Sequence, residues 1–156
     1  MKGIFDHSKE TLVQRTRDGD RGYEVITPLY ERVDKQSGDL HGIFINRGRI
    51  PYEYKDSGMH LTPPNETIAV EGVLLESEGF DKMHKRDEKN EGAAGDIGRI
   101  RINLMELLNK TDLANKDLAS RLYLKSVCFT KDGKIEQHRL PKPALPSDLC
   151  YWYVSP

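Results

Sequence analysis

Apolar and polar residues follow one another along this chain in the pattern of short β-strands separated by turns. The most compact run of strand-forming residues in the first half is Ile43-Phe44-Ile45, which is preceded by Gly42. β-Branched and aromatic residues bounded by turn residues favour a buried strand. We therefore expect a central strand within Gly42–Pro51, with a tight turn at Asn46-Arg47-Gly48 and the end of the hydrogen-bonded ladder at the final proline.

A second strand is predicted at 22–27, where Tyr, Val, Ile and Thr occur together and Pro28 ends the run. The turn-rich residues 34–39 lead from this segment to the central strand, so the two strands are expected to pair antiparallel. The charged residues 15–21 predict an exposed loop. The alternative interpretation of the central stretch is that Arg47 or Arg49 is catalytic. A buried strand ended by a turn explains the stretch more simply.

The polar cluster Asp6-His7-Ser8 could suggest a catalytic or metal site. Consecutive residues of a strand point to opposite faces, however, and a catalytic triad is assembled by the fold rather than by adjacency. Asp and Ser readily bond to their own backbone at turns. We therefore interpret this cluster as a turn.

The second half of the chain combines strand and helix patterns. A strand is expected at 68–75, with a bulge or sharp bend at Gly72, and a half-exposed strand at 99–102. Asn103 is a suitable N-cap for a short helix, since three leucines after it share one helical face: these are Leu104, Leu107 and Leu108.

A second helical turn is predicted at 117–121, followed by a strand at 122–129. The predicted fold class is therefore mainly β (α+β): a small antiparallel β-barrel or a strongly curved sheet with one or two short helices. We expect a single domain over 1–156, with a mobile charged loop near 81–95 and an extended, proline-rich aromatic tail at 140–156.

Composition narrows the functional classes. The chain has 156 residues, a formal net charge of −1 and 31% charged residues, which gives no basic field for nucleic acid. No apolar run approaches the roughly 18 residues of a membrane helix, and no signal peptide or presequence is visible. The sequence contains no nucleophile elbow, phosphate loop or dinucleotide fingerprint. We expect neither nucleic-acid binding nor enzymatic activity.

Neither cysteine nor histidine spacing predicts a metal site. The two cysteines, Cys128 and Cys150, form no CxxC pair; two free thiols and a disulfide both remain open. The histidines are dispersed without the i, i+4 spacing of ligands on one helical face: they are His7, His41, His60, His84 and His138. No metal-binding, catalytic or cofactor-binding residue is predicted.

Three stretches of this sequence resemble, in order, the Surfeit-one (Shy-one) family of cytochrome c oxidase assembly proteins. They are Gly3-Ile4-Phe5-Asp6-His7-Ser8-Lys9-Glu10, Gly22-Tyr23-Glu24-Val25-Ile26-Thr27-Pro28 and Ile45-Asn46-Arg47-Gly48-Arg49-Ile50-Pro51. The Val70-Glu71-Gly72-Val73 strand is a weaker match, and Tyr151-Trp152-Tyr153 is similar to the aromatic stretch that leads into the family's last membrane helix. The resemblance covers residues 1–76 closely and 97–156 loosely.

By this resemblance, the chain would be the family's domain on the intermembrane-space or periplasmic side of the oxidase, for which we expect the intermembrane-space side of the mitochondrial inner membrane. The two membrane helices of family members are not seen in this sequence. Expected partners are cytochrome c oxidase subunits or other membrane proteins of the respiratory chain. The domain would be peripheral to the membrane, as an assembly factor or accessory subunit. Haem a binding belongs to the family's membrane part and is not expected here. A free-standing carrier of haem or another apolar cofactor is the alternative. Tyr151, Trp152 and Tyr153 either pack back on the core or are the candidate contacts with a partner or a membrane surface.

Overall fold

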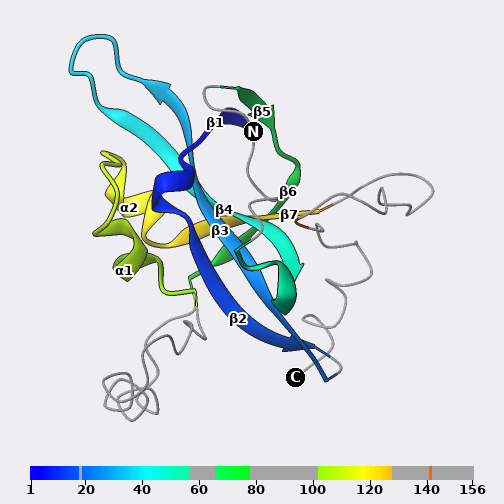
Figure 1. Cartoon of the computed structure of the whole chain (residues 1–156). Coiled ribbons are helices and arrows are strands. Elements are labelled where there is room, and N and C mark those ends of the chain that lie inside the picture. The colour runs from blue at the N-terminus through cyan, green and yellow to red at the C-terminus, as the bar shows by residue number, and fades with distance from the viewer. Residues whose placement is uncertain (18, 57–65, 78–101, 128–140, 142–156) are drawn as a thin grey trace.

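The computed structural model describes residues 1–17, 19–56, 66–77, 102–127 and 141. Within them lie seven strands, two short α-helices and two 3-10 turns (Figure 1). In chain order these are β1 Lys2–Phe5, η1 His7–Lys9, β2 Thr11–Arg17, β3 Asp20–Val33, β4 Leu40–Pro51, η2 Tyr52–Tyr54, β5 Thr67–Ala69, β6 Gly72–Glu76, α1 Leu104–Leu108, α2 Lys116–Ala119 and β7 Leu122–Ser126.

The strands form one strongly curled sheet around the long β3–β4 hairpin. The order is β5-β1-β3-β4-β7-β6, and β2 pairs with the first half of β3. Because the two end strands, β5 and β6, follow each other in the chain, the sheet curls back toward itself as a half-barrel. All pairs are antiparallel except β4 with β7, which is parallel. The predicted mainly-β class with a strongly curved sheet and short helices is confirmed.

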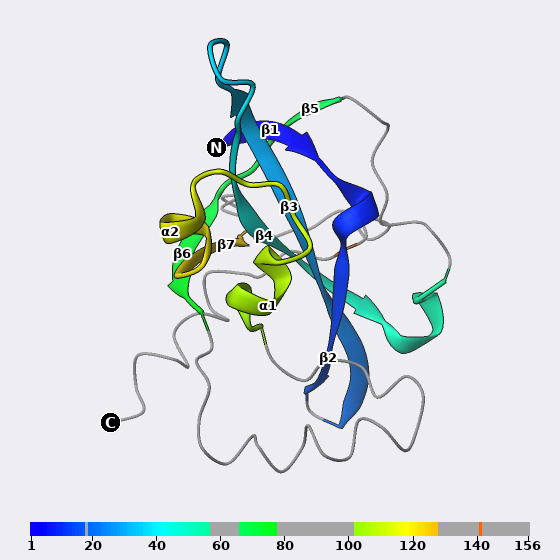
Figure 2. The same cartoon turned by 90° about the vertical axis from the view of Figure 1, so that its left-hand side faces the viewer.

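Both faces of the sheet carry buried apolar side chains. On one face, Ile26, Phe44 and Tyr123 pack with leucines of α1 and Leu113; the two helices lie together over this side (Figure 2). On the other face, Leu29, Ile43 and Ile45 pack with residues of the curled-over strands and loop. We call these the helix face and the inner face. The core therefore has two layers on either side of β3 and β4.

The predicted turn at Asn46-Arg47-Gly48 is wrong, because β4 continues through it as a β-bulge. Arg47 and Gly48 together oppose the single residue Val25, and Gly48 has φ 119°, a conformation that glycine adopts readily. The buried Asn46 accepts a hydrogen bond from the Gly48 N–H through Oδ1 at 3.1 Å. Its Nδ2 has no hydrogen-bond partner among the described residues. Turn-forming residues here bend a strand without ending it, whereas the predicted end at Pro51 is confirmed.

Pro28 does not end its strand either. β3 extends to Val33, and the Pro28 carbonyl accepts a hydrogen bond from the Asp6 N–H at 3.0 Å. The nitrogen and carbonyl of one strand residue point to the same edge, so the missing proline N–H faces η1, where β1 and β2 are interrupted. Proline is tolerated because no ladder hydrogen bond is required at that point.

The other local predictions divide in the same way. The predicted loop at 15–21 is wrong at both ends, since residues 15–17 belong to β2 and residues 20–21 begin β3. The strand predicted at 68–75 is interrupted at residues 70–71 and divided between β5, which pairs with β1, and β6, which pairs with β7. The 34–39 connection and the antiparallel β3–β4 pairing are confirmed. Cys128 and the predicted features at 81–95 and 99–101 lie outside the described residues.

Both predicted helices are present. Leu104, Leu107 and Leu108 are buried, as the helical spacing indicated. The side chain of Asn103 makes no capping hydrogen bond; instead the Leu104 N–H donates to Ser77 Oγ at 3.2 Å. A serine distant in sequence thus takes the expected role of the N-cap and joins α1 to the end of β6.

Asn115 completes the edge of β4 with its side chain. Its Nδ2 donates to the Gly42 carbonyl at 2.7 Å, and its Oδ1 accepts from the Gly42 N–H at 3.0 Å. The amide therefore replaces a residue of a neighbouring strand. We expect Asn115→Ala to lower the free energy of unfolding by about 2 kcal/mol, because two partly buried backbone groups lose their partners. Urea unfolding measures this, with the exposed Lys116→Ala as control; equal stability of the two variants would contradict the role of Asn115.

Candidate functional site

The three stretches that resemble one family meet in space on the inner face, beside η1. Phe5 and η1 come from the first stretch, Thr27 from the second and Arg47 from the third. We call this group the Glu10 cluster: Phe5, His7, Glu10, Thr27 and Arg47. Residues separated by up to 42 positions in the chain are thereby brought to one place, where β1 and β2 separate along β3.

One carboxylate oxygen is the centre of the Glu10 cluster. Glu10 Oε2 accepts hydrogen bonds from Thr27 Oγ1 at 2.7 Å and from Arg47 Nη1 at 3.2 Å, and lies 3.0 Å from His7 Nδ1. The Arg47 guanidinium lies over the Phe5 ring, 4.7 Å from its centroid, in cation–π geometry. The His7 ring is 5.9 Å from the Phe5 ring. The Phe5 ring thus packs against both the guanidinium of Arg47 and the ring of His7.

The Glu10–Arg47 pair is almost fully removed from solvent. Their side chains are 8% and 9% exposed. An ion pair at this depth pays a large desolvation penalty, which only good geometry and further hydrogen bonds compensate. Thr27 and His7 provide those further contacts. The cluster therefore fixes η1 onto β3 and β4, and Glu10 and Arg47 are not displayed for a ligand.

Asp6 belongs to the same turn but contacts the opposite side of β3. Its Oδ1 accepts hydrogen bonds from the N–H and hydroxyl of Ser8, and its Oδ2 accepts from Tyr30 Oη at 2.8 Å. Burial alone would raise the pKa of Asp6, but the hydrogen bonds from Ser8 and Tyr30 and the charge of Lys9 outweigh it and lower this pKa. The predicted turn chemistry of Asp6-His7-Ser8 is confirmed, and these residues also reach beyond the turn.

This shift predicts how stability depends on pH. A carboxyl whose pKa is lower in the folded than in the unfolded state stabilises the fold above its unfolded-state pKa, about 4. That contribution disappears as pH falls through the folded-state pKa. We expect Asp6→Asn to cost roughly 1 kcal/mol at pH 7 and progressively less below about pH 4. Urea unfolding across this range tests it, with the exposed Asp39→Asn as control at pH 7; a cost of Asp6→Asn that stays constant from pH 7 to about pH 3 would contradict the prediction.

Burial and the hydrogen bond to Asp6 raise the pKa of Tyr30 above its ordinary value, with the carboxylates of Asp6 and Asp112 adding to the effect. Tyr30 is therefore a hydrogen-bond donor to Asp6 throughout the neutral range. Because its folded-state pKa is the higher one, its contribution is present at neutral pH and is lost only in strong alkali.

Two open grooves accompany these clusters. One has a volume of about 550 Å³ and lies between residues 8–11 and residues 109–112. The second has a volume of about 400 Å³ and is formed where the β2–β3 turn meets η2. Its lining residues are Asp20, Arg21, Arg49, Pro51, Tyr52 and Glu53. We call it the η2 groove; both grooves are polar.

The histidines are not assembled into a ligand set in the part of the chain that the structure describes. His7 bonds Glu10, whereas His41 lies on the projecting end of the β3–β4 hairpin (Figure 1). No group of three His, Cys, Asp or Glu residues in the described ranges could hold a metal ion. His60, His84, His138 and Cys150 lie outside those ranges, as do Tyr151, Trp152 and Tyr153.

Among the described helices, none has both the length and the apolar character needed to span a bilayer.

The described part of the chain is a curled β-sheet domain in which three stretches that resemble one family converge on a buried ion pair. This arrangement is that of a structural core, and no metal-ligand cluster is assembled among the described residues. The family model described as "SURF1 family" matches residues 1–147. The chain therefore belongs to the SURF1 family, which is known for cytochrome oxidase assembly and is a family of assembly factors rather than catalysts. No curated protein matched the sequence.

Sequence reasoning did not identify Glu10 as the centre of the cluster. A signal was nevertheless present: Thr27 lies between Val25 and Leu29, at the positions where the pattern places apolar side chains. Arg47 likewise follows Ile43 and Ile45 at a two-residue spacing. Polar residues at inward positions of two paired strands indicate a buried polar contact, although the sequence does not say which carboxylate completes it.

Proposed function

We propose that this chain is a non-catalytic assembly factor or accessory subunit of cytochrome c oxidase, held at the intermembrane-space face of the mitochondrial inner membrane. The observation that carries the proposal is the family match over 1–147. The Glu10 cluster supports it, because the three stretches that resemble the family meet in contacts that hold the domain's shape. A well-packed domain of this kind suits a role in which it binds other proteins.

The experiment that tests the proposal is affinity purification of the tagged full chain from mitochondria in mild detergent, followed by native gel electrophoresis and mass spectrometry. Comigration with mature oxidase in near-equal amounts would identify an accessory subunit. Comigration with smaller oxidase intermediates would identify an assembly factor. Recovery of the chain without any oxidase subunit would contradict both forms of the proposal.

We further propose that the tail at 140–156 contributes to this association, with Tyr151, Trp152 and Tyr153 contacting a partner or the membrane surface. Tyrosine and tryptophan are enriched both at interface hot spots and at bilayer interfaces. Deletion of residues 151–156 should weaken oxidase recovery without lowering the stability of the curled sheet. Unchanged recovery would remove the tail from the proposal.

The alternative function, a carrier of haem or another apolar cofactor, has less support. An apolar cofactor needs an apolar pocket with a few placed polar groups. In the described residues, the inner face is filled by side chains such as Leu29, Ile45 and Val70, and charged or polar residues make up most of the lining of both grooves. These residues do not fit haem. Titration with haem, followed at the Soret band, tests this alternative. A Soret shift that disappears in His7→Ala or His41→Ala would favour the carrier, and we expect no such shift.

A further inference from the structure

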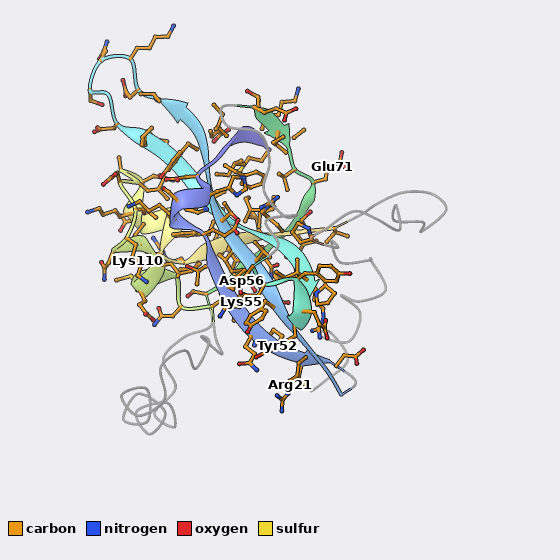
Figure 3. All side chains as sticks on the ribbon, viewed as in Figure 1. Arg21, Tyr52, Lys55, Asp56, Glu71 and Lys110 are labelled. Carbon is orange, nitrogen blue, oxygen red and sulfur yellow. The ribbon has the colours of Figure 1, made fainter. Side chains whose placement is uncertain are left out.

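The η2 groove combines exposed aromatic and cationic groups at the end of β4 (Figure 3). Tyr52 is 49% exposed, although it is a large aromatic residue, and Tyr54 of the same turn is 42% exposed. Arg21 is exposed beside Tyr52 in the lining of the groove. Tyrosine and arginine are the residue types over-represented at the energetic centres of protein interfaces.

The aromatic side of the η2 groove is held in place before any partner binds. The Tyr52 ring stacks on Tyr23, with 5.7 Å between centroids and 19° between planes. Tyr23 itself is buried with Val25 and Ile50, and Lys55 Nζ lies 5.6 Å from its ring centroid. The exposed ring of Tyr52 therefore rests on the core, and binding would cost little side-chain entropy.

The cationic side of the groove is held in place as well. Arg49 Nη2 donates to the Asp20 carbonyl at 2.6 Å, and Nη1 donates to the Arg15 carbonyl at 3.3 Å. The guanidinium passes beside Gly22, where a Cβ atom would lie 2.9 Å from Arg49 Cζ and 2.7 Å from the Ile50 carbonyl oxygen. Glycine at this position leaves the space through which Arg49 reaches the β2–β3 turn.

Neither arginine forms an ion pair with a carboxylate that the structure describes, Asp20 and Glu53 included. Both hydrogen bonds that Arg49 makes with described residues go to backbone carbonyls, so backbone groups rather than a described carboxylate hold its guanidinium in place. An arginine guanidinium binds a carboxylate with two parallel N–H···O bonds, and such pairs are among the strongest hydrogen bonds in proteins.

The charges of the groove also indicate the kind of partner. Arg21 and Arg49 are balanced by Asp20 and Glu53, so the groove has no net positive field to attract a polyanion such as an anionic bilayer or nucleic acid. A protein segment can present a single carboxylate to the arginines and an apolar or planar side chain to Tyr52. Mixed charge around exposed aromatics fits a protein surface best.

We propose that the η2 groove is the docking site for a partner protein, and that Arg21 and Arg49 receive an aspartate or glutamate of that partner while Tyr52 packs against its neighbouring side chain. This inference rests on the proposed association with the oxidase, in which the groove would be the point of contact. It assigns binding to residues at the end of β4, on a different side of the molecule from Lys110 (Figure 3).

The test is photo-crosslinking of the full chain in mitochondria, with benzoylphenylalanine placed at position 52 or, as control, at position 105. Met105 is exposed on α1, away from the groove. We expect the probe at position 52 to crosslink an oxidase subunit at a peptide that contains Asp or Glu. Arg21→Glu should reduce the crosslink about tenfold or more, whereas Lys110→Glu, which reverses a charge elsewhere on the surface, should leave it unchanged.

The outcomes separate this inference from the proposed function. Crosslinks to an oxidase subunit from position 105 and none from position 52 would overturn the docking site while leaving the association intact. Position 52 could instead crosslink an identified protein that is not an oxidase subunit, at an acidic peptide and only when Arg21 is present. That result would support the docking site and contradict the proposed partner. A crosslink that survives both Arg21→Glu and Arg49→Gln would overturn the role of the arginines. If neither position gives a crosslink, the docking site is overturned.

Discussion

Arg47→Met is expected to lower the free energy of unfolding by about 3–5 kcal/mol, because it leaves the buried Glu10 carboxylate without its cation. The two side chains are 9% and 8% exposed, so water cannot fully replace the lost contact. The substitution also removes the cation–π contact between the Arg47 guanidinium and the Phe5 ring. Urea denaturation followed by circular dichroism measures the change, with Arg21→Met, on an exposed arginine, expected to stay within about 0.5 kcal/mol.

The double variant Glu10→Gln/Arg47→Met gives this prediction its control. When both charges are removed together no uncompensated ion remains, so the double variant should be more stable than Arg47→Met alone. A double variant that loses the sum of the two single effects would show that the residues act independently. The Glu10 cluster would then not be a coupled ion pair.

Phe44→Ala is expected to cost about 3–5 kcal/mol by opening a cavity in the helix face of the core. Phe44 is 1% exposed and lies opposite Pro28 on β3 and Tyr123 on β7. Few neighbours can collapse into the space, because all three strands are fixed by hydrogen bonds. Thermal or urea unfolding tests this, with Met105→Ala on the exposed side of α1 as the matched control. A loss below about 1 kcal/mol would place Phe44 at a site that relaxes, contrary to its position at the centre of the sheet.

The sequence predicts those parts of the fold that depend on interactions between residues close together in the chain. Local patterns located the strands at 22–27 and 42–45 and both helices, since their signals lie within one element. They were wrong at Gly48 and Pro28, where tertiary pairing decides whether a turn-forming residue ends a strand or bends it. The edge residue Asn115 could not be assigned, because its partner lies 73 positions away.

The candidate sites depend on contacts between distant residues, so the sequence predicts them only in part. The sequence indicated the stretches that form the Glu10 cluster, through their resemblance to a family, but not that they meet at one carboxylate. The η2 groove was missed entirely. From the sequence alone, Arg49 is considered only as a possible catalytic residue, and Tyr52 is not considered. The stacking of Tyr52 on Tyr23 and the passage of Arg49 beside Gly22 show that these two residues lie together.

The parallel pairing of β4 with β7 has a consequence for the order of folding. Strands β1 to β4 occupy the first 51 residues and pair through connections that are short in sequence. By contrast, Phe44 is aligned with Tyr123, so the chain must make a long excursion before this pair can form. Loop closure over such distances is entropically costly and slow. The β3–β4 hairpin should therefore act as a template on which β7, β6 and β5 assemble afterwards, and native-state hydrogen exchange should show their amides opening at lower free energy than those of β3 and β4.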